Sequence, residues 1–219
     1  MTHLALKTAA GFALGLLIAG PASAVPLVPP TTILGNFTAD DDVQQFDFSI
    51  PSDSLVTIET ISYAGGEFAA SPGDFLSGGG FDPILSLFDS DGFFIAEQDD
   101  GSPNVDVITG SAFDTFFQPT LSAGTYTVVI TQFDNFFSGV VGDHISTGFD
   151  LTGDPNFTAA FGCAAGQFCD FSFPSDSRNK RFAINISAEA LAVPEPGALA
   201  MLGFGLLGVG MAYRRRLRA

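Results

Sequence analysis

The sequence predicts an all-β domain, specifically an antiparallel β-sandwich, between two apolar ends. Short runs of residues alternate between apolar and polar with a period of two, which is typical of strands with one buried face. Segments rich in Gly, Pro, Asp and Ser separate these runs and supply turns. The 24 Phe residues of the 219-residue chain provide large apolar groups for a core. Regularly spaced short strands with such joints favour a sandwich.

The first predicted strands lie in QFDFSI (residues 45–50) and SLVTIETISY (residues 54–63). One face of these two runs is formed by Phe46, Phe48, Ile50, Val56, Ile58 and Thr60. The same alternating pattern predicts four more strands: ILSLFD (84–89), FFIAEQ (93–98), TYTVVITQF (125–133) and FAINIS (182–187). IPSDS, YAGGEF, SDG, DDGSPN and LSAGT are the turn-forming joints.

Residues 1–24 have the pattern of a signal peptide. His3 and Lys7 precede an apolar stretch from residue 9 to 19, and Ala22-Ser23-Ala24 matches the small residues at a signal-peptidase site. We therefore expect cleavage after Ala24 and export. The alternative, a permanent membrane helix, is disfavoured because the apolar stretch is shorter than the ~20 residues that a span needs.

Residues 25–193 form the predicted exported domain, which is long enough for one hydrophobic core. This segment contains only three Lys or Arg residues against 23 of the 24 acidic residues, a formal charge of −20. Nucleic acid and anionic lipid are bound mainly by cationic side chains. The composition therefore excludes nucleic-acid binding.

The order of several segments resembles a known family. ADDDVQQFDFSIPSDSLVTIET, then FDPILSLFDSDGFFIAEQDDG, then LSAGTYTVVITQFD is similar to the jelly-roll-type β-sandwich of bacterial pre-peptidase C-terminal domains, over roughly residues 35–135. The resemblance implies a jelly-roll-like fold, but a shared fold does not by itself give a function.

The C-terminal segment explains how such a domain reaches its destination. Residues 197–213 carry no charge and would form a helix of ~25 Å, which just reaches across a hydrocarbon core of about 30 Å. By the positive-inside rule, the basic end that follows would stay in the cytoplasm while the domain lies outside. This basic end consists of Arg214, Arg215, Arg216 and Arg218.

A plain membrane anchor leaves Pro194-Glu195-Pro196 at the outer edge of this span unexplained. Together with the helix and the arginines, this trio resembles the tripartite PEP-CTERM sorting signal at residues 194–219. The resemblance implies a partner, an exosortase, that processes the tail near the trio. Pro suits such a site because it keeps the segment extended. The implied location is a transient inner-membrane anchor, then the cell surface or extracellular matrix of a Gram-negative-type bacterium.

The domain shows no catalytic signature. His144 is its only histidine, and the sequence contains no GxSxG, HExxH, P-loop or CxxC string. We therefore expect a non-enzymatic protein. Hydrolysis by a pair of carboxylates stays an alternative, because such pairs need not be close in sequence.

Cys163 and Cys169 are the only cysteines. An even number in an exported chain favours a disulfide, and the Gly-containing spacer can bend to bring the sulfurs together. A metal site is disfavoured because two thiols and a distant histidine supply too few ligands.

Three functional classes remain. The first is a non-enzymatic surface or matrix protein whose acidic domain associates with exopolysaccharide, other matrix proteins or divalent cations. The second is a carbohydrate-binding module, which would lack Trp and would use Phe93, Phe94, Phe136 or Phe137 instead. The third is a secreted hydrolase.

Aspartates at the ends of one strand-turn-strand unit are the only feature of the domain that suggests a ligand. A hairpin of ILSLFD and FFIAEQ would place Asp82 near Asp99 and Asp100, and Ca²⁺ would relieve the repulsion among their carboxylates. The alternative is that these residues only build turns and keep the protein soluble. The full candidate set for Ca²⁺ is Asp82, Asp89, Asp91, Asp99, Asp100 and Asp106.

Overall fold

The computed structural model describes residues 26–176 and 178–192. Within these ranges the regular structure is β-strand with two short 3-10 helices, which confirms the all-β prediction. No helix in the described ranges is both long and apolar enough to cross a membrane. The predicted signal peptide (1–24) and C-terminal helix (197–213) lie outside the described residues.

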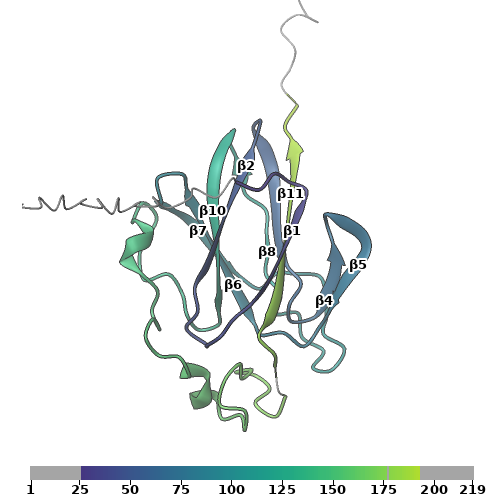
Figure 1. The fold of residues 1–219 in the computed structure, drawn as a ribbon, viewed down its shortest axis with the longest axis vertical. Helices are drawn as coiled ribbons and strands as arrows, with labels where there is room; N and C mark the ends of the chain where they lie inside the picture. Colours follow the sequence, from purple (N-terminus) through teal and green to yellow (C-terminus); the bar gives the residue numbers. More distant parts are fainter. Residues whose placement is uncertain (1–25, 177, 193–219) are drawn as a thin grey trace, which may run out of the picture.

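Two antiparallel sheets face each other (Figure 1). The first contains, in order, β1 (Thr31–Asn36), β11 (Arg181–Ala190) and β3 (Ser54–Thr60), with β8 (Phe116–Phe117) and β9 (Thr120–Leu121) both paired to β3. The second contains β2 (Gln44–Ile50), β10 (Gly124–Gln132), β6 (Pro83–Asp89) and β7 (Phe94–Asp99). This arrangement is that of a β-sandwich, and the jelly-roll connectivity stays a prediction.

The core lies between the two sheets. Phe48, Leu85 and Ile130 come from the second sheet and meet Ile58 and Ile184 of the first. In β3, burial alternates along the strand, as the period-two pattern predicted. β3 therefore contributes one apolar face to the core and turns the other face outward.

The strand β6 departs from this alternation, because six of its seven residues are buried. Its outer face is covered by the long connection between β10 and β11, which carries η1 (Ile145–Thr147) and η2 (Phe157–Phe161). Phe137 and Phe149 of this connection pack on Phe88 and Val129. A continuous apolar strand is the expected result when both faces are covered.

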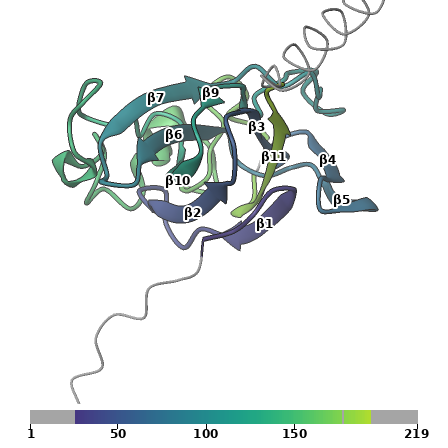
Figure 2. The same cartoon turned by 90° about the horizontal axis from the view of Figure 1, so that it is seen from above.

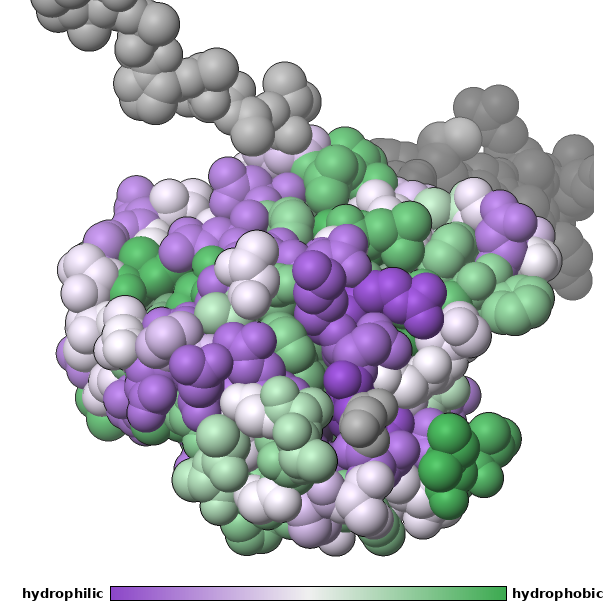
Figure 3. Space-filling view, turned by 60° about the horizontal axis from the view of Figure 1, so that its bottom comes forward, coloured by the Kyte–Doolittle hydropathy of each residue, from purple (hydrophilic) through white to green (hydrophobic). Residues whose placement is uncertain are grey.

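A separate hairpin, β4 (Gly65–Phe68) with β5 (Ser71–Ser77), projects from the side of the sandwich (Figures 1 and 2). The sequence analysis assigned YAGGEF to a joint, because its Gly residues and lack of alternation indicate a turn. The two strands instead pair with each other, and β5 is mostly exposed. Elsewhere on the surface, Figure 3 shows hydrophilic residues across the middle of one face and hydrophobic residues in separate groups towards its edges.

Candidate metal centre

Three aspartates meet where the β6–β7 hairpin opens. Asp82 precedes β6, Asp99 ends β7, and Ile84 pairs with Asp99 in the antiparallel register. This register brings the start of one strand beside the end of the other. Asp100 follows with a positive φ of 63°, which turns the chain back on itself.

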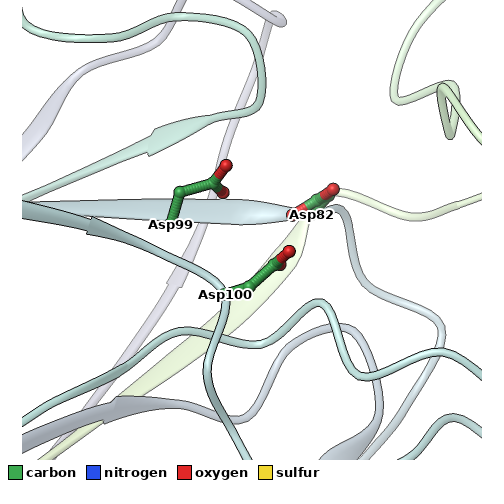
Figure 4. Close-up of side chains that lie close together, drawn as sticks. All are labelled: Asp82, Asp99 and Asp100. Carbon is green, nitrogen blue, oxygen red and sulfur yellow. The ribbon is translucent and has the colours of Figure 1, made fainter.

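The three side chains converge on a common space (Figure 4). One carboxylate oxygen from each of Asp82, Asp99 and Asp100 lies within 4.8 Å of the other two. The Oδ1 atom of each residue is inaccessible to solvent and has no hydrogen-bond partner. Buried polar atoms are normally paired, so three unpaired oxygens at one place indicate a missing proton or cation. We call these three residues the acidic triad.

The electrostatics of the triad favour the protonated form when no cation is bound. Burial raises the pKa of Asp82 well above its usual range, and the charges of Asp100 and Asp99 add to this effect. Burial, with Asp100 beside it, raises the pKa of Asp99 to about 6. Burial also raises the pKa of Asp100. A cation would reverse these shifts by favouring the ionised carboxylates.

The chemistry of the triad suits a hard cation. Ca²⁺ takes six to eight oxygen ligands in flexible geometry, and three carboxylates supply three to six of them. On the neighbouring strand β10, Thr131 and Gln132 pair with Ile84 and Pro83. Their side-chain oxygens are also buried without a hydrogen-bond partner.

The hairpin separates Asp89 and Asp91 from the triad, so the structure does not bring all six predicted residues together. These two residues lie in the turn between β6 and β7, at the opposite end of the hairpin. The Oδ1 of Asp89 accepts hydrogen bonds from the backbone N–H groups of Asp91 (3.0 Å) and Phe93 (2.8 Å). Their role is to build the turn, which was the alternative that the sequence left open.

Asp106 belongs to a second group, which we call the arginine cluster. The buried guanidinium of Arg178 lies 3.4 Å from Asp106, 3.7 Å from Asp170 and 2.9 Å from Asp176. It also lies 3.6 Å above the ring of Tyr63. Burial of Asp106 opposes ionisation, but the backbone N–H of Thr109 and the Arg178 guanidinium hold its pKa below the usual value. Asp106 is therefore neutralised by the protein itself.

Sequence reasoning missed the arginine cluster. Arg178 is one of only three cations among 23 acidic residues in the domain, and this scarcity is a signal that it has a specific partner. Its aspartates are distant in the sequence, however, so local spacing could not identify them.

Asp114 shows how a buried carboxylate is satisfied without a cation. It accepts hydrogen bonds from the backbone N–H groups of Ser62 (2.6 Å), Tyr63 (3.0 Å) and Ala64 (2.7 Å), and from the hydroxyl of Thr60 (2.9 Å). Burial nevertheless raises its pKa to about 6. Four donors make Asp114 a structural residue that fixes the chain after β3.

The other residues singled out in the sequence form a disulfide, aromatic contacts or a helix cap. Cys163 and Cys169 form a disulfide. Phe94 and Phe137 pack against Phe88. Phe137 is buried, so it is not available for sugar stacking, whereas Phe94 is partly buried. Phe93 packs edge-on against His144. Phe136 packs on Phe133, and His144 caps η1.

The sorting-signal residues Pro194, Glu195, Pro196, Arg214, Arg215 and Arg216 lie outside the described residues. Comparison with protein families identifies them: the PEP-CTERM protein-sorting motif matches residues 192–216. The chain thus carries a PEP-CTERM sorting signal, as its sequence predicts. The signal implies an exported protein that passes through the membrane and is sorted by an exosortase.

Among solved structures, the chain is similar to the pre-peptidase C-terminal domain of a collagenase from Bacillus anthracis. The two share 10% sequence identity with a TM-score of 0.38, and the match covers 77% of this chain and 98% of that domain. A likeness at this level says nothing about function. Comparison with curated proteins gave no match.

Proposed function

We propose that the chain is a non-enzymatic surface or extracellular-matrix protein of a Gram-negative-type bacterium. Its tail anchors it in the inner membrane until an exosortase processes it near Pro194-Glu195-Pro196, and it then reaches the surface or the matrix. The sorting motif at residues 192–216 is the observation that carries this proposal. The acidic β-sandwich, jelly-roll-like in connectivity, associates there with exopolysaccharide or other matrix components.

Ca²⁺ is the proposed ligand of the acidic triad. Three buried carboxylate oxygens without partners support it, because a divalent cation would neutralise them together. Extracellular modules bind Ca²⁺ with Kd values of ~10⁻⁴–10⁻³ M, so a site of this kind would fill outside the cell.

The non-enzymatic class is part of the proposal, and a secreted hydrolase is the competing one. Glycoside hydrolysis needs two carboxyl groups on either side of the scissile bond. The groove beside the β4–β5 hairpin is lined by one carboxylate, Glu67. Release of reducing sugar from exopolysaccharide by the purified protein would establish the hydrolase instead.

Replacement of Pro194-Glu195-Pro196 by three alanines tests the sorting. The tail still inserts, but the processing signal is gone, so we expect the variant to stay in the inner membrane with an intact C-terminus. Mass spectrometry of each cell fraction measures this. Release of the variant at the wild-type level would contradict exosortase processing.

A thermal melt of the exported protein tests the Ca²⁺ site. At ten times its Kd, Ca²⁺ should stabilise the fold by RT ln 11, ~1.4 kcal/mol, and raise the melting temperature by a few degrees. Mg²⁺ should do much less because it retains its waters. The matched control is Asp99→Asn/Asp100→Asn, which should not respond. Equal melting temperatures in Ca²⁺ and EDTA would make the triad a set of turn formers, and an equal rise with Mg²⁺ would reduce the effect to charge screening.

A further inference from the structure

The β4–β5 hairpin stands away from the sandwich because its base is built from glycines. A Cβ added to Gly65 would lie 2.4 Å from the backbone nitrogen of Gly78, and one added to Gly78 would lie 2.6 Å from the carbonyl oxygen of Ala64. Only glycine permits this close approach of two backbones. The glycines therefore fix the base, and Asn185 of β11 ties the turn to the first sheet: its side chain accepts a hydrogen bond from the backbone N–H of Ala69 (2.9 Å) and donates one to the carbonyl oxygen of Glu67 (2.8 Å). The strand β5 nevertheless stays exposed.

A groove lies between this hairpin and the loop that follows Asp100. Its volume is about 550 Å³, within the ~300–1,000 Å³ typical of ligand sites. Phe75 of β5 forms one apolar wall and Val105 of the loop another, and Phe75 is 72% exposed. An exposed Phe on a projecting hairpin has no role in the core, so its ring is available to a ligand.

The polar groups of the groove are held in defined positions. The carboxylate of Glu67 accepts a hydrogen bond from the backbone N–H of Gly73 (2.5 Å). The amide nitrogen of Asn104 donates one to Glu59 (3.3 Å). Both side chains line the groove, and no Lys or Arg does. The groove therefore combines an aromatic face, a carboxylate and an amide, without a cation.

We propose that this groove binds a neutral segment of exopolysaccharide, and this inference rests on the proposed association of the domain with that polymer. A pyranose ring has an apolar face of C–H groups and an edge of hydroxyls. The C–H face stacks on the negative face of the Phe75 ring, while the hydroxyls pair with Glu67 and Asn104. Acidic polymers are disfavoured because the exported domain carries a charge of −20 and the groove offers them no cation.

The test measures retention of the exported protein on polysaccharide. Exopolysaccharide secreted by the producing cells is separated by anion exchange into a neutral and an acidic fraction, and each is immobilised. Phe75→Ala removes the ring, and Phe75→Tyr keeps it. Phe171→Ala is the matched control, because Phe171 is 62% exposed and lies outside the groove. Thermal melts check that all variants stay folded.

We expect the wild type to bind the neutral fraction, with affinity lowered about tenfold or more in Phe75→Ala and unchanged in Phe75→Tyr and Phe171→Ala. Equal binding by Phe75→Ala and the wild type would overturn the groove while leaving the association with exopolysaccharide intact. The proposed neutral polysaccharide ligand would be wrong if the wild type bound neither fraction or only the acidic one. It would also be wrong if the wild type bound only matrix protein that co-purifies with the polysaccharide. The sorting of the protein would stand in each case.

Discussion

The domain contains two groups of buried or partly buried aspartates that differ in what neutralises them. In the arginine cluster, Asp106, Asp170 and Asp176 surround the guanidinium of Arg178. In the acidic triad, each residue has a buried oxygen without any donor. The chain itself supplies the cation of the first group, whereas no Lys or Arg of the described residues forms an ion pair with the second. A cluster of acidic residues is therefore not by itself evidence of a ligand site. The triad differs from the arginine cluster because no guanidinium lies beside its buried oxygens.

Replacement of Arg178 should cause the largest loss of unfolding free energy among the variants that test this comparison. Arg178→Met would leave buried carboxylates without their cation, and breaking a buried ion pair in this way costs ~3–5 kcal/mol. Urea unfolding of the exported protein measures the loss. The exposed Arg181→Met is the control and should stay within about 0.5 kcal/mol of the wild type. A loss below about 1 kcal/mol for Arg178→Met would mean that the cluster contributes little to stability.

The disulfide gives a smaller effect near the same cluster, because Cys169 directly precedes Asp170. By loop entropy, Cys163→Ser/Cys169→Ser should cost ~2 kcal/mol in unfolding free energy. It should leave the response to Ca²⁺ unchanged, since the triad lies on other strands. Labelling of denatured, unreduced protein should find no free thiol. Stoichiometric labelling would show that the exported protein does not form this bond.

These two regions also show what the sequence could predict. Apolar residues at short, strand-like spacing located β2, β3, β6, β7, β10 and β11. The juxtaposition of Asp82 with Asp99 and Asp100 followed from hairpin register, which depends only on neighbouring segments. The same register places Asp89 and Asp91 at the far end of the hairpin.

The parts that could not be predicted depend on distant contacts. Asp106 and Arg178 are 72 residues apart, and their pairing results from how the whole sandwich closes. β4 is short and half glycine, and β5 is mostly exposed, so apolar alternation did not mark either segment as a strand. Phe75 lies on β5, so no pattern pointed to it as a binding residue. The paired Phe residues that the sequence did suggest include Phe94 and Phe137, which pack against other aromatic rings.

The smallest predicted effect is a difference in pH dependence between the two groups. In the triad, the pKa of Asp99 is about 6 in the folded protein, against ~3.9 for an unfolded aspartate, so between these values the folded state binds more protons. Its unfolding free energy should therefore fall as pH rises from 4 to above 6. In the arginine cluster the pKa of Asp106 is lowered, so its contribution is present above about pH 4 and is lost as pH falls.

Thermal melts in EDTA from about pH 4 to above pH 6 measure how stability changes with pH. Asp114 titrates in the same direction as the triad, so the informative quantity is the difference between the wild type and Asp99→Asn/Asp100→Asn. The variant should lose less stability with rising pH, by a few degrees at most in melting temperature, because the triad is partly exposed and screened by solvent. Saturating Ca²⁺ should reduce the decline in the wild type but not in the variant, since the cation takes the place of the protons. If the melting temperatures of the wild type and the variant in EDTA change with pH in parallel, the triad is not the group that titrates. The two clusters would then differ in their contacts but not in their effect on the pH dependence of stability.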